Sequence, residues 1–361
     1  MRLNPLTLKK LRRFRSIKRG WWSFLFLLGG FLLSLVGELW INSRALIVSY
    51  EGQLFFPTYA SVYSGQDFGI EKDSAGSPYE YEVNYRELQK HFKGQGSGNW
   101  VLMPLVPWNP YENDFDGTGV AQPMKPDFSK KHYLGTDSTG RDIFSRLVYG
   151  FRIAMIFALG FVLLVYAIGV LIGCAMGYFG GLTDLLGQRL VEIWSNIPFL
   201  YMVIIMVAIV PPNLPVNIRI GLLLLIMVLF SWTAMTYYMR SAVYKEKARD
   251  YIAAAQLLGA NPWRILVHHL LPNTISTLVT FAPFTMATAI TSITALDFLG
   301  FGLPPPVPSL GELLKQGVSQ LQAPWIVVSA CVSMILTLSL VTFIGEAVRE
   351  AFDPKKFTTY Q

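Results

Sequence analysis

The sequence has little charge and almost no cysteine. Only 15% of its 361 residues are charged, whereas 52% are hydrophobic, and the mean hydropathy is +0.40. A soluble domain of this length would carry more charge and fewer long apolar runs. Cys174 and Cys331 both lie inside apolar runs, so the large polar region at 42–149 has no disulfide framework.

Motifs for chemistry are also absent. The sequence contains no GxxxxGK[ST] phosphate loop and no HExxH or Cys/His metal spacing, and the adjacent His268 and His269 would point about 100° apart on a helix. The apolar runs hold no chain of acids and histidines of the kind that a proton-coupled carrier uses. We therefore expect no catalytic residue, no metal and no cofactor in this chain. If the protein transports a substrate, the energy must come from elsewhere.

Several apolar runs approach the roughly 20 residues that a membrane-spanning helix needs, whereas a membrane β-barrel would show short alternating strands. We predict an all-α polytopic membrane protein. The six expected transmembrane helices are 21–41, 153–176, 193–210, 220–238, 274–299 and 325–344, with a glycine-rich connector at 177–190. Pro198 should kink the third of these helices, either as a tolerated packing feature or as a gating hinge.

Charge predicts the orientation. The N-terminal segment 1–20 is rich in Lys and Arg, holds no acid and directly precedes an apolar run, which is typical of a positive-inside signal rather than a nucleic-acid-binding arm. The run is long and lacks a cleavage site, so we expect a retained anchor. Arg349, Lys355 and Lys356 place the C-terminal segment 350–361 on the same side. We expect a cell inner-membrane protein with both termini cytoplasmic and a large periplasmic region.

That periplasmic region, 42–149, is rich in aromatic residues, which indicates a folded lid or small domain rather than a disordered linker. After a turn dense in capping residues, the stretch Arg141–Val148 is amphipathic. It predicts an interfacial helix on the outer surface. Asp297, near the end of the fifth span, is either exposed at the interface or a functional acid within the membrane.

The stretch Tyr244–Asn273 is a polar, alanine-rich island between two apolar runs. Residues 251–258 predict a short helix, which Asp250 favours at its start and Gly259 stops, and Asn261–Pro262 begins another. The pattern fits either an ordinary cytoplasmic helical hairpin or a handle that a motor protein grips from outside the membrane.

This island resembles the EAA loop of inner-membrane permeases of binding-protein-dependent ABC importers, in which EAA, three residues, Gly and nine residues precede I-x-LP. Ala253 replaces the glutamate and His269 the isoleucine, and both departures are typical of the di/oligopeptide branch. The positions that match at the same spacing are Ala254, Ala255, Gly259, Leu271 and Pro272.

Two other stretches, LGTDSTGRDIFSRLVYGFR from Leu134 and FLGFGLPPPVPSLG from Phe298, are similar to the C-type permeases of that branch. The resemblance covers about residues 131–354. The long insertion before LGTD is unusual for the branch. It resembles the permease of an importer linked to peptides and to the peptide-nucleotide antibiotic microcin C.

The resemblance implies a type I importer permease fold, with a core at 150–349 and an ATPase-coupling loop at 240–273. A homologous second permease would complete the path, and two ATP-binding subunits or one fused ATPase would grip the loops and use the ATP. A periplasmic peptide-binding protein would deliver the peptide substrate. Membrane lipid is the remaining partner, and nucleic acid is not expected.

The resemblance also implies the site residues. For the coupling loop they are Asp250, Tyr251, Ala253, Ala254, Ala255, Leu258, Gly259, Ala260, Asn261, Pro262, His269, Leu271 and Pro272. The residues of the periplasmic family motifs are Gly135, Thr136, Asp137, Gly140, Arg141, Asp142, Gly300, Pro305 and Pro306.

Two other classes of protein compete with this interpretation. An ion-gradient-driven secondary carrier would act without ATPase subunits. A membrane-anchored sensor would bind a ligand in its outer region, but the sequence offers no output domain and six spans exceed what a sensor needs.

Overall fold

The computed structural model describes residues 5–59, 62–70, 82–96, 98–115, 119 and 122–352. Lys355 and Lys356, on which part of the predicted orientation depends, lie outside these residues. The chain separates into two compact units. One comprises Met1–Gly29, Ala154–Pro304 and Met334–Gln361, and the other comprises Gly30–Ile153 and Pro305–Ser333.

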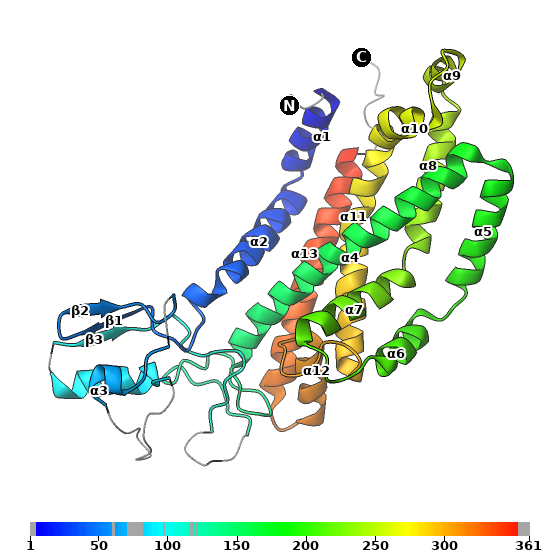
Figure 1. Ribbon diagram of the computed structural model, residues 1–361. Coiled ribbons are helices and arrows are strands. Elements are labelled where there is room, and N and C mark those ends of the chain that lie inside the picture. Colours follow the sequence, from blue (N-terminus) through cyan, green and yellow to red (C-terminus); the bar gives the residue numbers. More distant parts are fainter. Residues whose placement is uncertain are drawn as a thin grey trace. The chain divides into compact units, whose positions relative to one another are not determined.

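Most of the described chain is helical (Figure 1). The helices are α1 (Pro5–Ser16), α2 (Lys18–Leu35), η1 (Gly37–Leu39), η2 (Gln66–Phe68), α3 (Tyr85–Gln95), α4 (Ile143–Phe179), α5 (Gly181–Ser195), α6 (Phe199–Ile209), α7 (Val216–Leu229), α8 (Thr233–Lys247), α9 (Asp250–Leu257), α10 (Pro262–Arg264), η3 (Ile265–Leu270, a π-helix), α11 (Leu271–Leu299), α12 (Leu310–Ser319) and α13 (Pro324–Phe352).

Several of these helices are long and apolar enough to cross a membrane. They are α4, the continuous helix Pro262–Leu299 and α13, and the number rises to five if the bent pairs α5/α6 and α7/α8 each form one span. The remaining predicted span, 21–41, overlaps α2, which is not among these helices. This helix ends at Leu35 rather than at residue 41, and the 3-10 turn η1 follows it.

Two local predictions around α5 need correction. The predicted glycine-rich connector at 177–190 is mostly helical, because only Gly180 and Gly181 adopt positive φ angles and α5 begins directly there. The predicted kink at Pro198 is a complete break, with α5 and α6 bent by 76°. Proline lacks the N–H that would continue the helical ladder, so α6 restarts just after it.

The separate interfacial helix predicted at Arg141–Val148 is wrong. These residues lead into and form the first turns of α4, which runs without interruption to Phe179. Ile143 and Leu147 are buried against Leu313 and Ile326. The amphipathic pattern therefore arises from packing inside the protein.

The region between α2 and α4 contains a small sheet, which was not predicted from the sequence. β1 (Ile47–Tyr50) pairs antiparallel with both β2 (Gln53–Phe55) and β3 (Trp100–Leu102), in the order β2-β1-β3. One face of the sheet packs on α3 through a core that includes Val48, Phe68, Leu88, Phe92 and Val101. This aromatic-rich region is therefore folded.

A buried ionic cluster joins the start of α4 to α12 within the second unit. Asp137 and Arg146 are fully buried. Glu312 accepts a hydrogen bond from Arg141 Nη2 at 2.9 Å and another from Arg146. Arg141 Nε also donates to Asp137 at 2.8 Å. Two cations thus face two carboxylates, and the charges balance where water cannot screen them.

Removing one charge from this cluster should destabilise the fold. In Glu312→Gln, two buried guanidinium groups would share one carboxylate, and we expect destabilisation of about 3 kcal/mol. The readouts are a lower apparent melting temperature of the purified protein and faster hydrogen exchange in residues 137–146. In the control Glu346→Gln, which breaks the exposed pair with Arg19, the loss should stay below about 1 kcal/mol. Equal effects of the two substitutions would contradict a structural role for the buried cluster.

Candidate functional site

The Tyr244–Asn273 loop contains a short helix with well-defined ends. α9 covers eight residues, with Asp250 in its first turn, where a negative charge is favourable. At its other end, Gly259 has φ +77. The amide of Gly259 donates to Gln256 O and that of Ala260 to Ala255 O, both at 3.0 Å. This is the Schellman pattern, and it places the helix stop at the predicted glycine.

The chain restarts as a helix at the predicted residues. The side-chain oxygen of Asn261 accepts a hydrogen bond from the Trp263 amide at 3.0 Å, and Pro262 occupies the first helical turn. The helix then widens into the π-helical turn η3, which passes directly into α11 at Leu271. Pro272 lies in the first turn of α11. Because proline has no N–H, one carbonyl of the preceding turn receives no helical hydrogen bond from it.

Buried side chains and one tyrosine fix α9 on the neighbouring helices. Ile252 of α9 and Leu270 of η3 are fully buried. Tyr251 donates to Glu246 of α8 at 3.0 Å and accepts from Asn273 Nδ2 of α11 at 2.9 Å. Burial, followed by the hydrogen bond to Glu246, raises the pKa of Tyr251. The tyrosine therefore stays neutral and bridges three helices.

The side of the loop that faces away from the rest of the chain carries exposed apolar side chains. Leu257 and Leu258 are 89% and 88% exposed, the highest values among the large hydrophobic residues that the structure describes, and Trp263 is 67% exposed. Ala253 and Ala254 are also exposed. Exposed apolar groups that are held this firmly favour a binding surface for another protein. Leu258 was among the predicted loop residues, whereas Leu257 and Trp263 were not, because their exposure depends on how the folded chain packs around them.

α8, which carries the loop, is packed closely against α4. A Cβ atom added to Gly173 would lie 2.6 Å from Thr236 O, and one added to Gly169 would lie 2.7 Å from the Cβ of Met235. Such close approach requires glycine. Arg240 of α8 also donates from Nη2 to Asp184 of α5 at 2.7 Å. A displacement of the loop would therefore move α8 together with its neighbours.

The motif at 135–142, in the second unit, forms a rigid turn. Gly135 and Gly140 have φ +78 and +79, and a Cβ atom on either residue would collide with a backbone carbonyl oxygen. The carboxylate of Asp137 accepts hydrogen bonds from the amides of Thr139 and Arg141 at 2.9 and 3.1 Å. Thr136 Oγ1 accepts from the Met124 amide at 2.8 Å. These residues hold the turn together through their own hydrogen bonds.

Asp142 extends this turn to His132, a buried histidine that was not among the predicted site residues. Its carboxylate lies 2.8 Å from Nδ1 of His132, which is 1% exposed. The imidazole also lies 3.4 Å from Asp114 and stacks on Trp108 with ring centroids 4.0 Å apart. Among the described residues, no group of three or more His, Cys, Asp and Glu side chains could hold a metal ion.

The motif that begins at Phe298 also has a structural role. Gly300 ends α11 with φ +87. Asp297 is 7% exposed, so of its two predicted roles the one as an exposed interfacial residue is wrong. Its carboxylate accepts from the Leu303 amide at 2.6 Å and shapes the helix exit. In the second unit, the Pro305–Pro306 bond is cis, and Pro306 O accepts a hydrogen bond from Arg146 at 3.4 Å.

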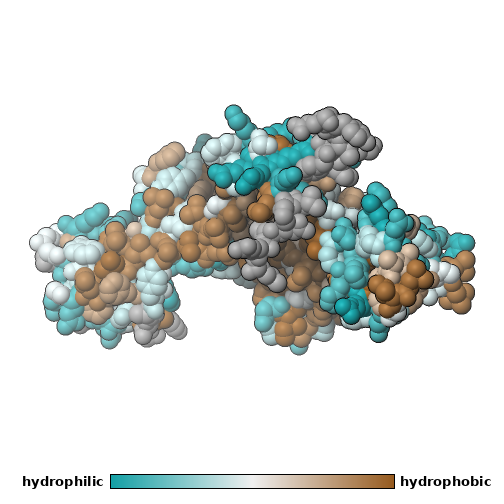
Figure 2. Space-filling model, turned by 90° about the horizontal axis from the view of Figure 1, so that it is seen from above, coloured by the Kyte–Doolittle hydropathy of each residue, from teal (hydrophilic) through white to brown (hydrophobic). Residues whose placement is uncertain are grey.

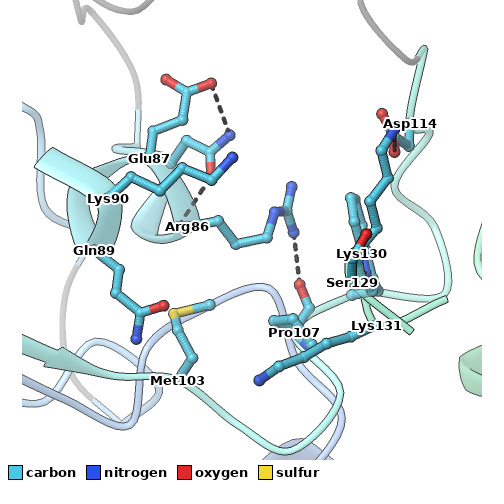
Figure 3. A pocket seen from close by; sticks show the side chains of 12 residues that line it. Arg86, Glu87, Gln89, Lys90, Met103, Pro107, Asp114, Ser129, Lys130 and Lys131 are labelled. Carbon is cyan, nitrogen blue, oxygen red and sulfur yellow. Dashed lines mark hydrogen bonds and ion pairs between the residues drawn. The ribbon is translucent and has the colours of Figure 1, made fainter. Parts of the chain in front are cut away.

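A pocket of about 370 Å³ lies beside α3 in the second unit (Figure 3). Arg86 is held in place by Pro107 O at 2.6 Å and by Glu112. Positively charged side chains outnumber acids in the lining, which favours anionic groups such as carboxylates. Its charged side chains are Arg86, Lys90, Lys130 and Lys131 against Glu87 and Asp114.

Comparisons with known proteins place the chain in a family. The family model described as "Binding-protein-dependent transport system inner membrane component" matches residues 169–358. The chain is 41% identical over 357 residues to the inner membrane ABC transporter permease protein YejE of Escherichia coli (strain K12), covering 98% of this chain and 99% of that protein.

Two other relatives differ in how much of the chain they cover. The peptidoglycan transport system permease protein YejE of Agrobacterium fabrum is 36% identical over 378 residues, covering 98% of this chain and 94% of the relative. The dipeptide transport system permease protein DppC of Lactococcus lactis subsp. cremoris is 34% identical over 259 residues, covering 69% and 72%. The chain belongs to the family of inner-membrane permease components of binding-protein-dependent ABC transport systems.

Proposed function

We propose that this permease moves peptides from the periplasm to the cytoplasm, driven by separate ATP-binding subunits that grip the Tyr244–Asn273 loop. One observation carries the proposal: Leu257, the last residue of α9, and Leu258, which follows it, are almost completely exposed, although Ile252 of the same helix is fully buried. The buried side anchors the helix, and the exposed leucines form an apolar surface that a partner could cover. The surface therefore fits a cleft on another protein.

The proposed orientation places the loop and both termini in the cytoplasm and the sheet-bearing region in the periplasm. It rests on the basic segment before α2 and on the positive-inside rule. In this orientation the loop faces the compartment that contains ATP. The family relationship supports partner ATPases, since the sequence has no phosphate loop with which to bind ATP.

Coupling would proceed through the contacts of α9. Closure of the ATPases on ATP binding would displace α9, and Tyr251 would pass the displacement to α8 through Glu246 and to α11 through Asn273. α8 would carry α4 and α5 with it because of its close glycine contacts and the Arg240–Asp184 pair. A homologous second permease would supply the other wall of the path, and a periplasmic binding protein would deliver the peptide.

The substrate class follows from the relatives, whose names refer to dipeptides and peptidoglycan. We propose peptides as the general class. We propose the peptide-nucleotide microcin C as one specific substrate, because the long insertion before Leu134 resembles that of the permease of an importer linked to this antibiotic. Fragments of peptidoglycan are a second candidate, which the Agrobacterium relative favours. Each of these ligands carries acidic groups, which suits the positive lining of the pocket in Figure 3.

Leu257→Glu should uncouple transport. A charge at the centre of an apolar contact removes a buried anchor, and we expect binding of the ATP-binding subunits to weaken by more than about tenfold. The measurements are co-purification of those subunits and peptide uptake by cells. Leu321→Glu is the matched control, because Leu321 is also an exposed leucine, at 81%, but lies outside the loop. Normal uptake by the Leu257 variant would refute the handle.

The permease alone should be inactive. Vesicles that contain only this chain should neither hydrolyse ATP nor accumulate peptide when an ion gradient is imposed. Both activities should appear once the second permease, the partner ATPases and the binding protein are added. Gradient-driven uptake by the chain alone would instead support a secondary carrier.

A further inference from the structure

We propose that the face of the β2-β1-β3 sheet opposite α3 lies against the lipid surface of the membrane that α2 enters. The sheet would then be a membrane-binding element, which holds the region between α2 and α4 at the headgroup layer. This inference concerns a surface that plays no part in the proposed coupling.

The register of the sheet separates two faces. Val48 pairs with Phe55 on one side and Val101 on the other, and these residues belong to or pack against the core beneath α3. Successive side chains alternate between faces. Ser49, with its partners Leu54 and Trp100, therefore lies on the opposite face.

This opposite face is apolar and exposed. Leu54 is 56% exposed, Phe56 43%, Trp100 46% and Leu102 47%. The three strands read IVSY, QLF and WVL and carry no charged residue. Figure 1 shows α3 on the other side of the sheet, and Figure 2, which looks onto the uncovered side, shows hydrophobic residues gathered there. A cluster of this kind marks a membrane or protein contact.

The connection to α2 keeps this face near the membrane. Only residues 36–46 separate the end of α2 from β1, and fully extended they would span about 40 Å at most. They are not extended freely. Val106 N donates to Trp40 O at 2.9 Å, Asn42 N to Val106 O at 3.1 Å and Leu46 N to Leu102 O at 2.9 Å. Backbone hydrogen bonds thus fix the linker along residues 102–106, the end of β3 and the segment after it. Tyr149 of α4 also donates to Ile41 O at 3.2 Å.

The apolar surface continues along this connection, which favours lipid as the occupant. At the end of α2 and in the linker, Leu33, Leu35, Val36 and Leu39 are 57%, 42%, 47% and 41% exposed. A helix end that enters lipid and a sheet face that follows after the linker 36–46 would share one environment. The indole of Trp100 adds a ring with an apolar body and a polar N–H, which prefers the membrane interface.

Fluorescence quenching can measure whether this face contacts lipid or water. In the full chain with Cys174→Ala and Cys331→Ala, a fluorescent bimane label is placed by Leu54→Cys or Leu102→Cys, and the protein is reconstituted in lipid nanodiscs. Nitroxide-labelled lipid should quench these labels several-fold more than a label at Lys93→Cys, an exposed position on α3. Iodide in the water should show the reverse order.

Two results would overturn the proposal. Equal quenching by iodide at all three positions would show that the sheet face is in water. Protection of the Leu54 and Leu102 labels from both quenchers would show that a protein covers the face instead. Native-like hydrogen exchange in β1 of each labelled variant serves as the folding control, since these side chains are largely exposed and their replacement removes little packing.

Discussion

The proposed coupling depends on the burial of Ile252, the side chain that seats α9 on its neighbours. With Leu270 and the Tyr251 bridge, it converts a short polar loop into a fixed part of the helix bundle. An isolated helix of eight residues is unstable in water, so α9 exists because tertiary contacts hold it. The same contacts leave Leu257 and Leu258 in solvent and make them available to a partner.

The ends of this helix could be predicted from sequence because capping is local chemistry. A glycine with φ above zero, an asparagine that accepts a neighbouring amide and a proline in the first turn all act within a few residues. The exposure of Leu257 and Trp263 could not be predicted in this way. It depends on how α9 is seated on α8 and η3, which are contacts of the folded chain.

Predictions failed where tertiary packing determines what a pattern means. The amphipathic stretch after Gly140 looks like an interfacial helix, but its apolar side packs against α12 and α13. The sheet was missed because its strands have only three or four residues, too few for a clear alternation. Pro198 was recognised as a helix distortion, yet the 76° bend depends on how α5 and α6 pack.

The family motifs divide into two physical kinds. Those around Gly135 and Asp137 build a rigid turn whose charges are balanced inside the protein. The Tyr244–Asn273 loop, in contrast, presents uncovered apolar groups. The residues that resemble a family pattern most closely are therefore structural in one case and positioned for contact in the other, and burial distinguishes the two.

Site-specific photo-crosslinking in native membranes tests the central claim most directly. A photoreactive side chain at position 257 should form a covalent adduct with an ATP-binding subunit, and the yield should change when ATP is added. The same side chain at position 321 should form none. Absence of the adduct at 257, or an equal yield at both positions, would contradict the account.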